Sequence, residues 1–280
     1  MLAPAVVYIV ALVGLPFVLA ILYSLTDVKV ASEEFHFVGL RNFADAVGNP
    51  TFRRALRNSF LFTVASQAAV LAGATTLALA LKEAFRTRHF IRLLILLPWV
   101  APISLGTIGW KWLLDSIYSV FNWFLTRLHL VSTAPMWLGE PGLAMASVVM
   151  VHTWRMLPFA TVVLLAGLTS IPRDIPEAAA VDGAGFWRTH FQITLPMVRP
   201  IVTVAVLFGT IFTFTDMTVV YILTRGGPYD TTQVLPSLAF FTGILAGDLS
   251  GGAAISLFLF PLLVLAAWLM LKIARRSVVT

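Results

Sequence analysis

Cysteine and charge are what this 280-residue sequence lacks. It contains no cysteine, which excludes disulfides, thiolate metal sites and a cysteine nucleophile. Charged residues make up only 11% of the chain, against about 25% in soluble proteins, while 59% of the residues are hydrophobic. With a mean hydropathy of +0.91, this composition excludes a soluble globule, a disordered chain and a coiled coil. The sequence is that of an integral membrane protein.

Motifs of catalysis, metal binding and nucleic-acid binding are absent as well. The five histidines are scattered without an HExxH pair, so we expect no metal site. Because no GxSxG motif, carboxylate pair or Ser/His/Asp cluster occurs in an interpretable context, we predict that the chain is not an enzyme. The 19 lysines and arginines lie between apolar blocks rather than on one stripe, which is typical of membrane flanks and not of a nucleic-acid interface.

Long apolar runs predict six transmembrane helices. About 20 apolar residues cross a hydrocarbon core of roughly 30 Å as a helix, and lipid leaves the backbone amides no other partner. We therefore expect an all-α, polytopic membrane protein with a single transmembrane domain over residues 1–280. The first run is too long for the apolar core of a signal peptide and no basic segment precedes it, so it is kept as a span. The expected spans are about 2–24, 59–81, 92–112, 143–169, 198–223 and 250–271.

Basic residues orient these spans only weakly. With six spans both termini lie on one side, and Lys272, Arg275 and Arg276 in the tail favour the cytoplasm for that side. The inner loops and tail then carry ten lysines and arginines, and the outer segments carry eight. This difference is too small to determine the orientation of the spans, which depends on another feature of the sequence.

The connection between the fourth and fifth predicted spans, residues 170–197, is far longer than the two to eight residues that join helices. Glu177 and the three alanines after it favour a short helix. Gly183 ends this helix because glycine accepts a left-handed backbone, and Phe186 and Trp187 begin a second short helix. We expect the aromatic side chains either to be covered by a partner or to fold back on the membrane surface.

Seven positions in this connection have the spacing of a known motif. Glu177-Ala178-Ala179 is followed after three residues by Gly183, and after nine more by Ile193, one residue and Leu195-Pro196. This pattern resembles the EAA loop of binding-protein-dependent ABC importer permeases. The resemblance implies the ABC type I importer permease fold and a cytoplasmic coupling helix, with Ala179 on its docking face, that seats in a groove of the ATPase. The residues implied at this contact are Glu177, Ala178, Ala179, Asp182, Gly183, Phe186, Trp187, Ile193, Leu195 and Pro196.

Two further segments extend the resemblance over most of the chain. WRMLPF at residues 154–159 and FTD at 214–216 with YILTRGGP at 221–228 are similar to the sugar-permease branch of this family. The branch implies import of a carbohydrate, which can be a mono- or oligosaccharide, a polyol or glycerol phosphate. No GxxxxGK[ST] motif is present, so ATP and Mg²⁺ would be bound by a partner ATPase and this chain would hold no cofactor.

The same resemblance implies a set of partners and a location. The partners are a second, homologous permease, two copies of an ABC ATPase, an extracytoplasmic sugar-binding protein and membrane lipid. The location is the inner membrane of a bacterial or archaeal cell, crossed several times, with both termini in the cytoplasm.

Two ionisable residues interrupt the apolar spans, namely Arg155 in the fourth and Asp216 in the fifth. Such residues are costly in lipid and usually face the bundle interior or a water-filled cavity. We expect both on the sugar path, together with Phe214 and Tyr221. An ion pair between helices without substrate contact is the alternative.

Two other functions compete with an ABC permease. A secondary sugar transporter driven by an ion gradient should show discontinuous helices in an inverted repeat and acids inside the membrane, and only Asp216 supports it. A membrane-embedded enzyme would need an acid–base or metal constellation, which the sequence does not offer.

Overall fold

The computed structural model describes residues 3–32, 35–83 and 85–276. In these ranges every regular element is a helix, and an isolated β-bridge joins Thr26 to Phe37. The longer helices and their π-helical segments are α1 (Ala3–Ile9), η1 (Val10–Gly14), α2 (Leu15–Ser24), α4 (Pro50–Lys82), α5 (Arg88–Val100), α6 (Ile103–Leu113), α8 (Pro141–Thr169), η2 (His190–Thr194), α11 (Leu195–Thr215) and α15 (Leu259–Arg276). The shorter elements are α3 (Arg41–Gly48), α7 (Val120–Arg127), α9 (Asp174–Val181), α10 (Phe186–Thr189), α12 (Thr218–Leu223), α13 (Leu235–Phe240), η3 (Phe241–Leu245) and α14 (Leu249–Leu257).

Five continuous helices in the described ranges are long and apolar enough to cross a membrane, and the bent pair of α5 and α6 gives a sixth if the two helices count as one span. Five or six candidate spans agree with the six predicted from the sequence, although several boundaries differ. The five continuous helices are Pro4–Ser24, Pro50–Lys82, Pro141–Thr169, Phe186–Thr215 and Leu249–Ile273. Leu2, the first residue of the predicted first span, lies outside the described residues.

The third predicted span, residues 92–112, is wrong as a continuous helix. α5 ends at Val100 and α6 begins at Ile103, and the two are bent by 96° relative to one another. Pro102 precedes α6, and proline disfavours a helical conformation in the residue before it. The apolar length of the run was correct, but this proline divides it.

The fifth predicted span, residues 198–223, is displaced along the chain. The helix runs without interruption from Phe186 to Thr215, so the second short helix predicted after Gly183 is the beginning of this span. It stops before Asp216, whose backbone is extended, and α12 follows as a separate short helix. Most of the predicted loop 170–197 is therefore helical, and residues 182–185 alone separate α9 from the long helix.

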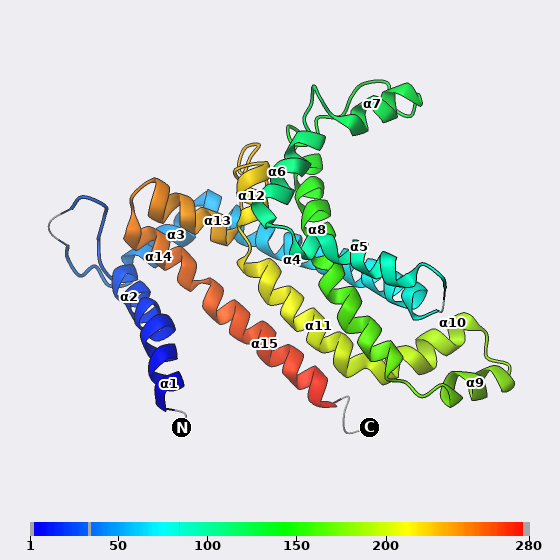
Figure 1. Ribbon diagram of the computed structural model, residues 1–280. Coiled ribbons are helices and arrows are strands. Elements are labelled where there is room, and N and C mark those ends of the chain that lie inside the picture. Colours follow the sequence, from blue (N-terminus) through cyan, green and yellow to red (C-terminus); the bar gives the residue numbers. More distant parts are fainter. Residues whose placement is uncertain (1–2, 33–34, 84, 277–280) are drawn as a thin grey trace.

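α4, α8 and α11 pack against one another and form the centre of the bundle (Figure 1). Small side chains allow the close approach, since Ala74 and Ala78 of α4 are fully buried beside Met156 of α8. Apolar attraction between helices is weak in lipid, so such tight packing and internal hydrogen bonds hold a membrane bundle together.

The first span stands apart from this bundle in Figure 1. None of its most apolar 18-residue window is buried, and its second half, α2, contacts α14. The start of α1 and the end of α15 lie at the end of the molecule that carries α9 (Figure 1). The first span therefore offers its apolar surface to lipid or to another chain.

Candidate functional site

Residues 174–195, here called the coupling segment, project from one end of the bundle (Figure 1). α9 has Asp174 in its first turn, where a negative charge is favourable. At its end the Ala184 N–H donates to the Ala179 carbonyl at 2.9 Å, and the Gly183 N–H donates to the Ala180 carbonyl at 3.1 Å. With φ of 77° at Gly183, this is a Schellman cap, and it confirms the left-handed glycine predicted there.

Exposure within the coupling segment differs from the expected docking face at one position. Ala179 is buried, with 6% of its surface accessible, so its predicted place on an exposed docking face is wrong. The small side chain faces inward. Val181, by contrast, is 88% exposed at the end of α9, where the sequence had drawn no attention to it. Glu177, Ala178, Asp182, Gly183 and Pro196 are exposed, and Ile193 and Leu195 are half-buried.

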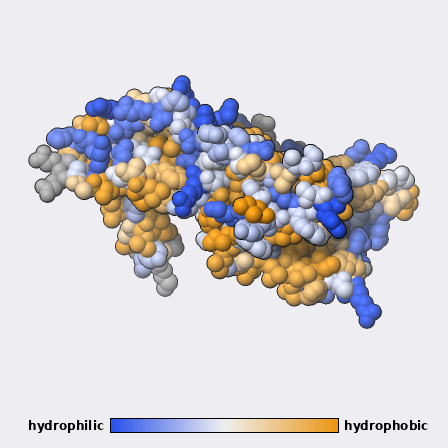
Figure 2. All heavy atoms as spheres, turned by 90° about the horizontal axis from the view of Figure 1, so that it is seen from above, coloured by the Kyte–Doolittle hydropathy of each residue, from blue (hydrophilic) through white to orange (hydrophobic). Residues whose placement is uncertain are grey.

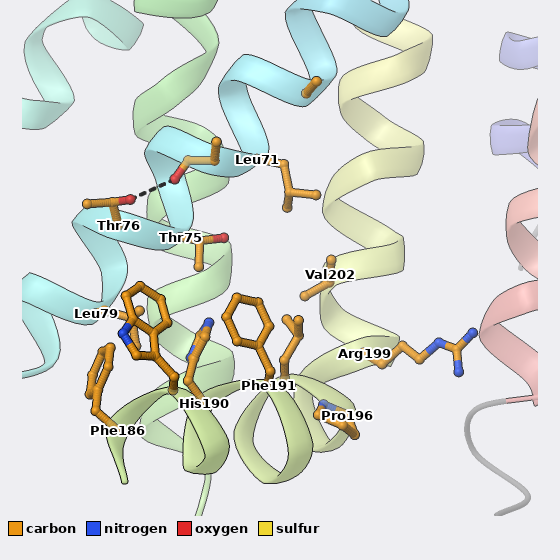
Figure 3. A pocket seen from close by; sticks show the side chains of 14 residues that line it. Leu71, Thr75, Thr76, Leu79, Phe186, His190, Phe191, Pro196, Arg199 and Val202 are labelled. Atoms are coloured by element: carbon orange, nitrogen blue, oxygen red, sulfur yellow. Dashed lines mark hydrogen bonds between the residues drawn. The ribbon is translucent and has the colours of Figure 1, made fainter.

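The aromatic residues of the coupling segment lie beside α4. Phe191 and His190 rise from the helix toward Leu71 and Leu79 (Figure 3), and Trp187 stacks on Phe191 with ring centroids 5.8 Å apart. They line an apolar groove of about 1030 Å³ between α4 and the start of the long helix. Trp187 and Phe191 nevertheless remain 69% and 55% exposed, so cover by a partner and folding back on the membrane surface both stay predictions for these rings.

A network of five polar side chains joins α4, α8 and the end of α11. We call it the buried polar network, and its members are Gln67, His152, Arg155, Thr213 and Asp216. Asp216 Oδ2 accepts from His152 Nδ1 at 3.0 Å and from Arg155 Nη1 at 3.2 Å. Asp216 Oδ1 accepts the Thr218 N–H at 2.8 Å and so begins α12. The His152 side chain is fully buried, whereas that of Arg155 is 29% exposed.

Thr213 links Asp216 and its partners to α4. The Thr213 hydroxyl donates to the Gly209 carbonyl at 2.7 Å, accepts from Gln67 Nε2 at 3.0 Å and lies 2.9 Å from His152 Nε2. Since a carboxylate only accepts, Nδ1 of His152 donates to Asp216. Asp216 thus has both His152 and Arg155 as hydrogen-bond donors.

The four residues that the sequence predicted on the sugar path separate into two groups. Arg155 and Asp216 meet in an ion pair between α8 and the end of α11. Phe214 is buried and packs its ring against Phe60 at 5.3 Å. Tyr221 packs on Phe240, the last residue of α13, and on Phe241, which follows it. Neither of these two aromatic residues joins the polar network.

His152 was missed by the sequence reasoning, although a signal existed. It stands three residues before Arg155, and Thr213 stands three before Asp216, so each pair shares one helix face. In the described ranges no group of three or more metal-ligating side chains comes together.

An aromatic cluster continues the face of the polar network along α8 and α11. Trp99 of α5 stacks on Phe159 at 5.2 Å, and Phe212 contacts both rings at 6.2 Å. Phe159 is four residues after Arg155 and Phe212 four before Asp216, which places them on the same helix faces. Phe208 completes the cluster, and this chain leaves Trp99, Phe208 and Phe212 partly exposed.

Solved structures with this fold and sequence relatives point to one family. A crystal structure of a bacterial ABC transporter that imports the acidic polysaccharide alginate matches with a TM-score of 0.85 and 20% identity, covering 99% of this chain and 94% of the other. The trehalose/maltose transport system permease protein MalF of Thermococcus litoralis is 35% identical over 85% of this chain and 80% of its own length. The sulfoquinovosyl glycerol transport system permease protein SmoG of Agrobacterium fabrum is 30% identical over 98% of this chain and 89% of its own.

The family model for the inner membrane component of binding-protein-dependent transport systems matches residues 69–279. This range includes the coupling segment and all but one member of the buried polar network, since Gln67 precedes it. The chain is therefore a multi-pass membrane protein that belongs to the family of inner membrane components of binding-protein-dependent transport systems.

Proposed function

We propose that this chain is the permease subunit of an ATP-driven carbohydrate importer. It forms half of the translocation path and has no catalytic activity of its own. ATP and Mg²⁺ are bound by a separate ATPase, which acts on this chain through the coupling segment.

The observation that carries this proposal is the exposed coupling segment. α9 is closed by a Schellman cap and presents Val181, 88% exposed, at the end of the bundle. The rings of Phe186, Trp187 and Phe191 on the same segment are more than half exposed as well, and several exposed apolar side chains at an aqueous end call for a covering surface, which a docked ATPase provides. The helix after the cap continues directly into the fifth span, so a force on the coupling segment reaches the membrane.

The partners proposed from the sequence fit this arrangement. They are a second homologous permease, two ATPase copies and an extracytoplasmic sugar-binding protein, with both termini of this chain in the cytoplasm of a bacterial or archaeal cell. A carbohydrate substrate is supported by the relatives named for trehalose/maltose and sulfoquinovosyl glycerol transport. A binding-protein partner is supported by the structural neighbour in complex with an alginate-bound periplasmic protein.

The aromatic cluster and Arg155 are our candidates for the sugar path. Aromatic rings with a few polar groups are typical of small-molecule sites, and Arg155 remains 29% exposed beside the cluster. The rival secondary transporter depends on Asp216 as an ion-coupling acid. His152, Arg155 and the Thr218 N–H already engage that carboxylate, which favours a structural role for its charge.

The coupling role can be tested by substituting Gly183 and Gly185, which have equal free space around them but different backbone conformations. A Cβ at Gly183 or at Gly185 would meet nothing within 4 Å, but only Gly183 has a left-handed φ, of 77°. Gly183→Ala should therefore cost about 1 to 2 kcal/mol in the turn, and Gly185→Ala should not. We expect Gly183→Ala, and more strongly Gly183→Leu, to weaken copurification of the ATPase and to lower sugar-stimulated ATP turnover in the reconstituted complex.

Gly185→Ala and Gly185→Leu are the matched controls and should retain both properties. Membrane levels of the permease should stay equal in all variants, since the turn lies outside the spans. Normal copurification together with normal stimulated turnover in Gly183→Leu would remove the coupling role from this segment.

A further inference from the structure

The apolar groove between α4 and the long helix Phe186–Thr215 has the length of one leaflet of a bilayer. On α4 its lining runs from Ala68 to Leu79, 11 residues later, which is about 17 Å at 1.5 Å per residue. Half of a hydrocarbon core of roughly 30 Å is about 15 Å. On the long helix the lining runs from Phe186 to Val202. The groove therefore extends from the end of the spans to about the middle of the membrane.

Apolar side chains form most of the walls of this groove. Leu71 and Leu79 of α4 line one side, and Phe191 and Val202 of the long helix line the other (Figure 3). Arg199 lines it as well, but the charged end of its side chain points away from the other lining residues in Figure 3. With about 1030 Å³ of space between these walls and Phe191 still 55% exposed, the described part of the chain leaves the groove unfilled.

A smaller recess of about 500 Å³ continues the groove at the end that carries α9. The groove and the recess share Leu79, Phe186 and His190. Lys82, in the last turn of α4, and Thr189 of α10 also line the recess. An apolar channel that ends in a cation at the level of the membrane surface has the same order as a phospholipid, whose acyl chains lie in the core and whose phosphate lies at the surface.

The connection that follows α4 adds positive charge to the same end of the groove. Residues 82–92 contain one acid, Glu83, and four cations, which are Lys82, Arg86, Arg88 and Arg92. Arg92 Nη2 donates to the Leu81 carbonyl at 3.0 Å, which ties this connection to the end of α4. Within the ranges that the structure describes, no ion pair neutralises any of the four cations. Basic clusters at the cytoplasmic end of membrane spans attract anionic lipids.

His190, where the groove meets the recess, has a ring nitrogen without a partner. The residue is 6% exposed, and its Nδ1 is buried with no hydrogen bond from any residue that the structure describes. Figure 3 shows the ring between those of Phe186 and Phe191 in the wall of the groove. Buried polar atoms nearly always have a hydrogen-bond partner, so an unpaired one in the wall of an unfilled groove points to a group supplied by a bound molecule.

We propose that this groove binds an anionic phospholipid of the cytoplasmic leaflet, with an acyl chain between α4 and the long helix and the phosphate beside Lys82. This inference rests on the proposed function for the orientation of the chain. Figure 2 looks onto the end of the molecule opposite α9 and shows apolar surface along the flanks, where lipid surrounds a membrane protein. Val181 does not line the groove, so a bound lipid leaves it free to contact the ATPase.

The test uses the full-length permease, purified in detergent with any subunits that stay bound, and adds either phosphatidylglycerol or phosphatidylcholine. Native mass spectrometry counts the lipids retained, and the wild type should retain phosphatidylglycerol more strongly. Ala72→Trp places a ring in the groove and should weaken this retention at least about tenfold, because acyl contacts are lost. Ala69→Trp is the matched control, since Ala69 is exposed on the same helix but does not line the groove.

Two further variants separate the acyl contact from the phosphate contact. Val202→Trp fills the groove from the long helix and should also weaken retention, which keeps the test valid if Ala72→Trp does not fold. Lys82→Gln should lower the preference for phosphatidylglycerol over phosphatidylcholine about fivefold. Lys111→Gln removes the same charge from the last turn of α6 and should keep the preference of the wild type.

The outcomes separate this inference from the proposed function. Equal retention of the two lipids by the wild type, or undiminished retention of phosphatidylglycerol by both groove-filling variants, would overturn the lipid site and leave the proposed function intact. Retention by the isolated permease that disappears in the assembled complex would show that another subunit fills the groove, and would overturn the lipid site as well. If no ATPase copurifies with the wild type, the proposed function is in question, but lipid counting needs no partner and still tests the groove.

Discussion

His152 and Asp216 are 64 residues apart in the sequence, and they meet inside the bundle with 3.0 Å between Nδ1 and Oδ2. Arg155 reaches the same carboxylate oxygen from one turn further along α8. Asp216 follows the last helical residue of the fifth span, so this contact ties the break in that span to the middle of α8. Of the two side chains that contact Asp216, His152 is the more deeply buried, because its side chain is fully buried while that of Arg155 is 29% exposed.

We expect Asp216→Asn to leave the complex assembled, to lower its thermal stability and to impair transport. Removing one member of a buried ion pair leaves an uncompensated charge, which costs about 3 to 5 kcal/mol. Thermal unfolding of the purified complex and sugar uptake by cells measure the two effects.

Double variants distinguish the two partners of Asp216. Arg155→Gln combined with Asp216→Asn should recover more stability than His152→Gln combined with Asp216→Asn, since arginine keeps its charge when Asp216 is removed and a histidine has a neutral form. An equal recovery in both, or wild-type stability and uptake in Asp216→Asn alone, would contradict this assignment.

Val181→Asp should weaken ATPase copurification while the permease itself stays folded. Val181 is 88% exposed, and substitutions at such surface positions usually change stability by less than about 0.5 kcal/mol. Ala179→Asp is the matched comparison, because Ala179 is buried and a charge there should destabilise α9 itself. Copurification and limited proteolysis of the coupling segment check both. Proteolysis of Val181→Asp as fast as that of Ala179→Asp would argue against the prediction.

Gly252→Ala should destabilise the packing of α14 against α13 and η3 by about 1 to 3 kcal/mol, the usual cost of overpacking. A Cβ there would lie 2.7 Å from the Gly243 nitrogen and 2.9 Å from the Ala239 carbonyl oxygen, and backbone atoms cannot turn away as a side chain can. Gly109→Ala, inside α6 with nothing within 4 Å of the added carbon, should be neutral or slightly stabilising. Thermal unfolding of the two variants gives the comparison, and a smaller loss in Gly252→Ala than in Gly109→Ala would refute it.

Phe212→Ala should reduce sugar uptake without loss of assembly, if the aromatic cluster lines the sugar path. Phe212 is 44% exposed and shares a helix face with Asp216. Phe260→Ala serves as the control, because it also removes an exposed ring, 53% accessible, but from α15 and outside the aromatic cluster. Uptake of labelled sugars at equal permease levels is the measurement, and equal uptake by the two variants would exclude Phe212 from the path.

Single cysteines at positions 40 and 86 should report the orientation, since the natural sequence contains none. Leu40 is 71% exposed before α3, and Arg86 is exposed before α5. We expect an impermeant maleimide to label position 40 and not position 86 in whole cells. The reverse labelling would overturn the orientation and would place the coupling segment outside the cell.

The helical structure of the spans and their approximate number were predictable from the sequence, because lipid permits few alternatives to a helix. The turn at Gly183 was predictable as well, since few residues other than glycine accept φ of 77°. The break at Pro102 was missed because counting apolar residues measures the length of a span but not its continuity.

Only some of the candidate-site residues were predictable from the sequence, because the site depends on which residues share one face of a helix. Arg155 and Asp216 were identified because charges are conspicuous in apolar runs. Phe214 was taken together with Asp216 from the FTD motif at residues 214–216, but two residues along a helix point to nearly opposite sides, and the face of Asp216 is that of Phe212. His152 resembles a lone core histidine until its partners on α11 are known.

The uninterrupted helix from Phe186 to Thr215 has a mechanical consequence. Its 30 residues span about 45 Å at 1.5 Å per residue, with the aromatic rings of the coupling segment at one end and Asp216 just beyond the other. Pro196 and Pro200 each remove a backbone hydrogen bond, and both lie in the half nearer to Phe186. A displacement applied at that end is therefore absorbed first as bending near the two prolines, and the stiffer remainder turns as a rod that strains the contact between Asp216 and His152. One helix therefore carries the displacement from the coupling segment to the contact with His152.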